Sequence, residues 1–84
     1  MMFKAIVTVM LKKSVLDPQG AAVERALKSH GQTGLESVRI GKVIELVLEG
    51  ASVAEVETRV TEWSDQLLAN PIMETYTVRV EKMS

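Results

Sequence analysis

The amino-acid sequence predicts an α+β fold of the split βαβ type, in which a four-stranded antiparallel sheet carries two helices on one face. Apolar and polar residues alternate in the first and last of four short runs, and the two middle runs are rich in β-forming residues, which together indicate four strands. Two further runs place apolar residues at spacings of three and four, which is typical of helices. The order strand, helix, strand, strand, helix, strand is most simply satisfied by this sandwich. The chain is expected to form a single domain, residues 1–84.

The first predicted strand covers residues 3–11, where apolar and polar positions alternate. A period of two places successive side chains on opposite faces of a sheet. One face would carry Phe3, Ala5, Val7, Val9 and Leu11, and the other would carry Lys4, Ile6, Thr8 and Met10. We expect the helices to cover the first of these faces.

The first predicted helix begins after Asp17. This residue is expected to accept hydrogen bonds from first-turn N–H groups, and Pro18 fits the first helical position because its missing N–H would be unpaired there. Gly31 is a suitable left-handed stop. Gly20 needs a reason, because glycine inside a helix costs about 0.5–1 kcal/mol relative to alanine. It predicts a close approach at this point, by another backbone or by another chain.

Residues 36–49 contain two β-rich runs on either side of Gly41 and Lys42. Glycine favours the first central position of a type II′ turn, which joins two antiparallel strands. The sequence therefore predicts a hairpin at Gly41 and Lys42, with the second strand before it and the third strand after it.

The second predicted helix begins at a capping box, in which Ser52 accepts from the N–H of Glu55 and Glu55 reaches back to the start of the helix. Its apolar positions recur at helical spacing and are Val53, Val56, Val60, Trp63 and Leu67. Asn70 and Pro71 are expected to end this helix, with Asn70 as a left-handed cap.

The last predicted strand is centred on Tyr76, Val78 and Val80, which alternate with polar residues. If the helices cover one face of the sheet, the opposite face is half apolar. Its apolar residues are Ile6, Met10, Val43 and Val47. Burial of apolar area is favourable by roughly 25 cal/mol per Å², so we expect these residues to form a contact between subunits. Scattered exposed aliphatic residues that need no partner are the alternative.

The composition argues against several classes of protein. The chain has no cysteine, so disulfide frameworks, iron–sulfur clusters and cysteine zinc sites are excluded. The net charge is −1 with both signs well mixed, and we expect no nucleic-acid partner. The apolar run in residues 1–13 is interrupted by Lys4 and Thr8 and is too short to span a bilayer, so we expect no membrane association. A cytoplasmic protein is the resulting expectation.

Residues suited to catalysis are few. His30 is the only histidine, and its place near a helix end favours a structural role. The carboxylates show no acid–base or metal-binding spacing. The glycines within residues 31–34 lack the lysine and serine that follow in a phosphate-binding loop. The sequence therefore predicts no catalytic residue, no metal site and no cofactor bound by this chain.

Three motifs occur in order along the chain. They are residues 16–20, residues 38–42 with Glu45 and Leu46, and residues 67–71 with Glu74 and Tyr76. Together they resemble the PurS family, the small subunits of bacterial and archaeal phosphoribosylformylglycinamidine (FGAM) synthase. The resemblance implies a non-catalytic subunit in de novo purine biosynthesis. In this family such a subunit brings an ATP-dependent synthetase subunit and a glutaminase subunit together, so that ammonia from glutamine reaches formylglycinamide ribonucleotide.

The resemblance also implies partners and contact residues. Family members form dimers or larger oligomers, and the complex is expected to use ATP and magnesium bound outside this chain. The residues expected to contact the other subunits are Asp17, Pro18, Gln19, Gly20, Arg39, Gly41 and Lys42. For Arg39 and Lys42, simple solvation of the hairpin is an equally open alternative. A second interpretation of the function is a small regulatory domain of the ACT type, which has the same strand order and binds amino acids at dimer interfaces.

Overall fold

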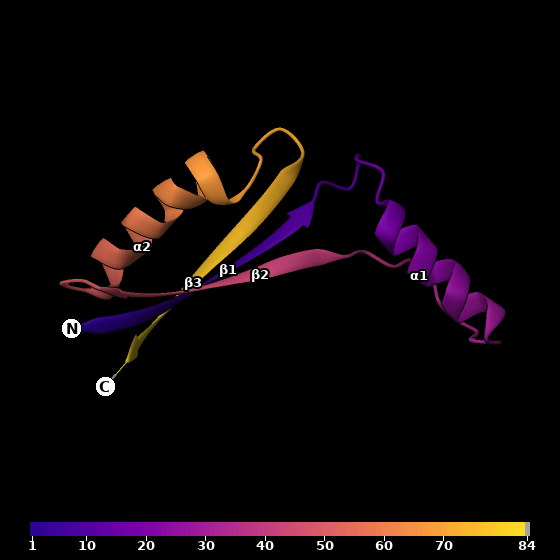
Figure 1. Cartoon of the computed structure of the whole chain (residues 1–84), viewed down its shortest axis with the longest axis horizontal. Helices are drawn as coiled ribbons and strands as arrows, with labels where there is room; N and C mark the ends of the chain where they lie inside the picture. The colour runs from indigo at the N-terminus through magenta and orange to yellow at the C-terminus, as the bar shows by residue number, and fades with distance from the viewer. Residues whose placement is uncertain (84) are drawn as a thin grey trace.

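A computed structural model describes residues 1–83 and contains one antiparallel sheet and two α-helices (Figure 1). The elements in chain order are β1 (Met2–Leu11), α1 (Pro18–Ser29), β2 (Gly41–Glu49), α2 (Val53–Trp63), a short π-helix η1 (Ser64–Leu68) and β3 (Glu74–Met83). The strand order is β2-β1-β3, and both pairs are antiparallel. The α+β class is confirmed, but the sheet within residues 1–83 has three strands where four were predicted.

The missing strand results from the role of Gly41, which lies inside the sheet and forms no hairpin turn. Residues 35–40 approach the sheet as irregular chain, and Gly41 begins β2 in register with Met10. A type II′ turn requires a positive φ, which in residues 1–83 occurs only at Gly31 and Gly34. A Cβ atom at Gly41 would collide with the Met10 side chain and the Val9 carbonyl oxygen. This glycine therefore permits a close approach of two strands, and the predicted hairpin is wrong.

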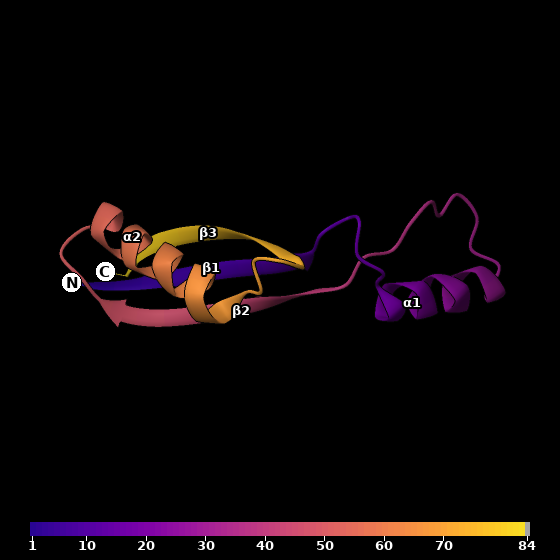
Figure 2. The same cartoon turned by 90° about the horizontal axis from the view of Figure 1, so that it is seen from above.

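The core lies between the sheet and α2, which crosses one face of the three strands (Figure 2). The predicted alternation of β1 is confirmed, because its odd-numbered side chains point toward this helix. The buried apolar residues are Phe3, Ala5, Val7, Val9, Val56, Val60 and Ala69. Tyr76 borders this core, and its hydroxyl donates a hydrogen bond to Asp65 Oδ1 at 3.1 Å. A helix and a sheet thus bury their apolar faces against each other, as the patterns predicted.

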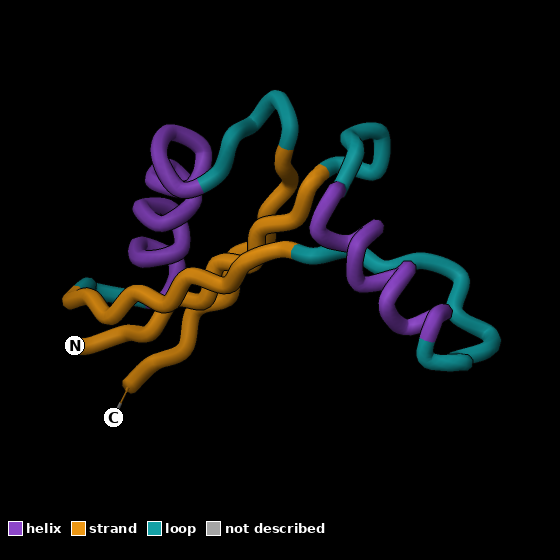
Figure 3. The backbone as a smooth tube through the Cα atoms, turned by 45° about the vertical axis from the view of Figure 1, so that its right-hand side comes forward, coloured by secondary structure: helices purple, strands orange, loops and turns teal. Residues whose placement is uncertain are grey.

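The helix α1 lies beyond the ends of the strands and covers neither face of the sheet (Figures 1 and 2). The prediction that both helices share one face is therefore wrong, since only α2 does so. The molecule extends over 50 × 29 × 15 Å, and its radius of gyration is 16.5 Å. A compact domain of this length has a radius of gyration of about 12 Å. Long connections at both ends of α1 carry it away from the sheet (Figure 3).

The start of α2 agrees with the prediction, whereas its end does not. At its start, Ser52 Oγ accepts from the N–H of Glu55 at 3.1 Å, which confirms the cap, while Glu55 Oε1 accepts from the N–H of Ala51 at 3.1 Å. At its end, the chain widens into η1, and this change of helical pitch turns Leu67 outward, where it is 80% exposed. The placement of Leu67 on the apolar face was therefore wrong.

Asn70 ends the helical segment by a different route from the one predicted. No residue other than glycine has a positive φ within residues 1–83, so Asn70 is not a left-handed cap. Its side-chain Oδ1 accepts from the N–H of Ile72 at 3.0 Å, and its carbonyl oxygen accepts from the N–H of Glu74 at 2.7 Å. The asparagine side chain thus forms a local turn that leads the chain into β3.

Candidate partner interface

Asp17 lies where α1 meets the end of the sheet, and it is only 7% exposed. Its Oδ1 accepts from the N–H of Gly20 at 2.9 Å, which confirms the predicted helix cap. Its Oδ2 accepts from the N–H of Ile40 at 2.9 Å and lies 3.9 Å from Arg39 Nε. One carboxylate therefore connects the start of α1 with the chain that enters β2.

Several hydrogen bonds to this carboxylate favour its ionised form. The backbone N–H of Gly20, followed by that of Ile40, holds the pKa of Asp17 below its ordinary value of 3.8. The loss of hydration on burial opposes the shift, and the charge of Arg39 adds to it. Asp17 is therefore a carboxylate at neutral pH, and its contacts are charge-assisted hydrogen bonds.

Arg39 turns toward its own chain. Its Nη2 atom donates to the carbonyl oxygens of Leu11 at 2.9 Å and Lys12 at 2.8 Å, at the end of β1. We call Asp17 and Arg39 the hinge clamp, because together they join the end of β1, the start of α1 and the entry to β2. From the sequence, Arg39 was predicted to lie beside a hairpin and to contact a partner. Its hydrogen bonds to carbonyl oxygens of its own chain were not predicted.

Gly20 is buried at the first turn of α1 because another part of the chain passes against it. A Cβ atom at this position would lie 2.5 Å from the carbonyl oxygen of Val38. That separation is far inside normal van der Waals contact, so only glycine fits without a shift. Of the two explanations offered from the sequence, the close approach is therefore made by the chain's own backbone.

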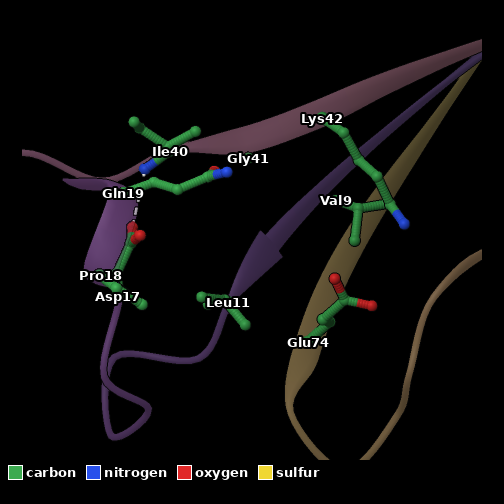
Figure 4. A pocket seen from close by; sticks show the side chains of 9 residues that line it. All are labelled: Val9, Leu11, Asp17, Pro18, Gln19, Ile40, Gly41, Lys42 and Glu74. Carbon is green, nitrogen blue, oxygen red and sulfur yellow. Dashed lines mark hydrogen bonds between the residues drawn. The ribbon is translucent and has the colours of Figure 1, made fainter.

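A groove of about 370 Å³ opens between the first turn of α1 and the nearby ends of the strands (Figure 4). It lies on the sheet face that carries α2. Figure 4 shows Gln19 on the α1 side of the groove, and Lys42 and Glu74 on the strand side. The lining residues are Val9, Leu11, Asp17, Pro18, Gln19, Ile40, Gly41, Lys42 and Glu74. The structure thus brings five of the seven predicted contact residues to one groove, while Gly20 and Arg39 lie outside its lining.

Glu74 is the one charged residue of this groove that was not proposed as a contact. It opens β3, and its Oε1 accepts from the N–H of Asn70 at 2.7 Å, which fixes the carboxylate direction. Its only sequence signal was its place in the third motif. With Lys42, it gives an apolar groove a rim of both charges, a chemistry that fits a protein surface.

The second predicted surface is the sheet face opposite α2. The pairing register places Ile6, Met10, Val43 and Val47 together on that face, as predicted. Val43 is 63% exposed and Val47 is 58% exposed. Lys4 and Glu45 form an ion pair of 3.5 Å among them. This face is therefore a mixed apolar and charged surface that no part of residues 1–83 covers.

Residues 1–83 contain neither a cluster of metal-binding side chains nor a membrane-spanning helix. No group of three or more His, Asp or Glu side chains is placed to hold a metal ion. None of the described helices is both long enough and apolar enough to cross a membrane.

Comparison with known proteins identifies the family. The model of the PurS family, described as phosphoribosylformylglycinamidine (FGAM) synthase, matches residues 4–82. The PurS subunit of FGAM synthase from Bacillus subtilis is 45% identical over 82 residues, which cover 98% of this chain and 96% of that subunit. The structure of Thermus thermophilus PurS is 39% identical, with a TM-score of 0.88 over 100% of both chains. A chain in the structure of PurLQS from Thermotoga maritima is 31% identical, with a TM-score of 0.87 over 96% of this chain and 99% of that chain. These matches confirm the family resemblance seen in the three motifs: the chain belongs to the PurS family.

Proposed function

We propose that this chain is a non-catalytic subunit of FGAM synthase in cytoplasmic de novo purine biosynthesis, and that it bridges the synthetase and glutaminase subunits. The observation that carries the proposal is the end-to-end similarity to PurS subunits, including one described in a PurLQS structure. Bridging would hold the two active sites in a fixed relation, so that ammonia reaches the activated formylglycinamide ribonucleotide before it escapes into water.

The two candidate surfaces support this role because they lie on different parts of one small chain. The groove offers Gln19, Lys42 and Glu74 over an apolar floor to another subunit. The sheet face with Val43 and Val47 is suited to a second copy of this chain, in a dimer or a tetramer. ATP and magnesium would act on the synthetase subunit, with no cofactor bound by this chain.

The ACT-type alternative depended on four strands in the order predicted from the sequence. The sheet within residues 1–83 has three strands and leaves α1 beyond its end, so this alternative loses its structural basis. No observation in the described residues favours an amino-acid site over a protein interface.

The decisive experiment is an assay of FGAM formation by purified synthetase and glutaminase subunits, with and without this chain. With glutamine as the nitrogen donor, we expect synthesis to require the chain. With ammonium salts, we expect synthesis by the synthetase subunit alone to proceed without it. Equal rates with and without the chain under both conditions would contradict a coupling role.

The oligomer surface is tested separately by Val43→Asp, which places a charge at the centre of the proposed subunit contact. We expect a substantially weaker self-association in sedimentation velocity, because a buried unpaired charge is strongly unfavourable. Thr58→Asp, on the exposed side of α2, is the matched control. An unchanged oligomer with Val43→Asp would remove this face from the interface.

A further inference from the structure

The helix α1 is attached to the rest of the molecule at one end only. Within Pro18–Ser29, Gly20 alone is buried, and it belongs to the first turn. Val23 and Leu27, farther along, are 39% and 38% exposed. The later side-chain hydrogen bonds of this helix, from Lys28 to Glu24 and from Ser29 to Ala26, stay within it. The direction of the whole helix therefore depends on what holds its first turn.

The contacts at that first turn converge on the hinge clamp. Asp17 binds the N–H groups of Gly20 and Ile40, and Arg39 binds the carbonyl oxygens of Leu11 and Lys12. The two side chains also form an ion pair with each other. Three chain segments are thus joined by four hydrogen bonds between these two side chains and the backbone, and by the ion pair between the side chains themselves. Two long connections, residues 12–17 and residues 30–40, would otherwise leave the helix free to turn.

We propose that Asp17 and Arg39 are positioning residues that set the angle between α1 and the sheet. Within one chain, these contacts join the first turn of α1 to the end of β1 and to the entry of β2. When either side chain is replaced, α1 turns about its first residues while the sheet and α2 keep their structure. The groove lies against the same hinge, so its α1 wall moves with the helix. This inference concerns the chain alone and does not depend on the proposed role in FGAM synthase.

Arg59, which lies far from the hinge clamp, provides a matched control. Arg59 also donates to a backbone carbonyl oxygen, that of Glu49 at 2.9 Å, but it does so between α2 and the end of β2. It also lies 5.2 Å from the centre of the Trp63 ring. Arg59→Met therefore removes the same kind of contact as Arg39→Met, at a point remote from the hinge.

The test measures the distance between α1 and α2 by electron–electron double resonance. The chain has no cysteine, so Arg25→Cys on α1 and Glu57→Cys on α2 give two unique sites for spin labels. Both positions are exposed, and neither forms an ion pair in the described chain. Doubly labelled chain is diluted into an excess of unlabelled chain, so that only distances within one molecule are recorded.

We expect a single narrow distance distribution for the labelled parent. Arg39→Met should make it at least about twice as wide or displace its centre, whereas Arg59→Met should leave it unchanged. Circular dichroism and thermal unfolding establish that the sheet is folded in each variant. Should Arg39→Met fail to fold, Asp17→Asn replaces it, because asparagine keeps an oxygen for the helix cap but loses the charge.

Two results would overturn the inference. One is a distribution for a folded clamp variant that is the same as that of the parent. The other is an equal broadening by Arg59→Met, which would mean that any lost arginine contact loosens the whole chain. Neither result affects the coupling assay, because the distance measurement uses no other subunit.

Discussion

The two α-helices of this chain are nearly equal in length, 12 residues in α1 and 11 in α2, yet they are used in opposite ways. α2 buries Val56 and Val60 against the sheet, whereas α1 buries only a glycine. Both begin with a confirmed side-chain cap, at Asp17 and at Ser52. Capping and amphipathic spacing thus determine where a helix forms, while its connections to neighbouring strands determine what it covers.

The chain segments that connect each helix to β2 differ in length and in the contacts that hold them. Only three residues, 50–52, lie between β2 and α2, so the helix must turn back over the sheet it has just left. The chain between α1 and β2 is much longer, residues 30–40, and its end is held by Asp17 and Arg39 at the edge of the sheet. The packed half of the molecule thus depends on apolar burial, and the projecting half depends on polar contacts at a hinge.

The strongest test of this contrast is Phe3→Ala in the packed half. Phe3 is 1% exposed beneath α2, so its truncation leaves a cavity in a small core. We expect the free energy of unfolding to fall by about 3–5 kcal/mol, measured by urea denaturation. Met2→Ala, on the opposite face of the same strand, is the control and should change stability far less. A decrease in the free energy of unfolding of less than about 1 kcal/mol for Phe3→Ala would contradict a core between the sheet and α2.

Asp17→Ala is the corresponding test in the projecting half. It removes a helix cap and leaves the N–H of Ile40 without its partner, so we expect the melting temperature to fall by roughly 5–15 °C. Asp17→Asn should recover part of that loss, because its amide oxygen can still serve the cap. A melting temperature equal to that of the parent would show that the clamp contributes nothing to stability.

The pH dependence of stability should distinguish a charged clamp from a neutral cap. Since the pKa of Asp17 is lowered on folding, its contribution is fully present above the unfolded value near 3.8 and is lost as the pH falls through the folded value. We therefore expect the stability difference between parent and Asp17→Asn to be constant from about pH 7 to pH 5 and to shrink below about pH 4. A difference that stays the same down to about pH 2.5 would contradict an ionised clamp.

A smaller effect is expected from Lys42→Ala at the rim of the groove. Lys42 is exposed, so we expect stability to change by less than about 0.5 kcal/mol. In the coupling assay, the concentration of this chain that gives half-maximal glutamine-dependent synthesis should rise by roughly 3- to 10-fold. Lys82→Ala, at another exposed lysine near the other end of the sheet, is the control. The same titration curve for Lys42→Ala and the parent would remove Lys42 from the interface.

The smallest effect is expected from Leu27→Ala on α1. Leu27 is 38% exposed and alanine is a good helix former, so stability in dilute solution should change by less than about 0.5 kcal/mol. A decrease in the free energy of unfolding as large as that of Phe3→Ala would contradict the difference between the two helices, because it would show that α1 packs as tightly as α2 in solution. Urea denaturation at two protein concentrations separates packing within one chain from packing between copies.

The features predicted correctly are those encoded by neighbouring residues. These features are the alternation of β1, the cap at Ser52 and the alternation of β3. In each of them, the residues that form the pattern are only a few positions apart in the sequence. The prediction was wrong at Gly41 because a single sequence does not show which strand pairs with this residue. A glycine that allows two strands to approach closely and a glycine that forms a turn therefore look the same in the sequence. The outward rotation of Leu67 follows from a π-helical turn that apolar spacing does not reveal.

The candidate site was predictable only in part, for the same reason. Asp17 was identified as a cap, but its second bond is to the N–H of Ile40, 23 positions away. Arg39 was identified as a contact residue, while its carbonyl partners lie 27 and 28 positions earlier. Such contacts arise from how segments meet in space, and a motif in a single sequence gives the residues without their geometry.

The two ends of the described chain meet side by side. Met2 pairs with Met83 at the end of the sheet that is remote from α1 and the groove (Figure 1). An affinity tag or fluorescent protein fused at either end would therefore lie far from the hinge clamp, and immobilisation through it would leave α1 and the groove exposed to the solution (Figure 1).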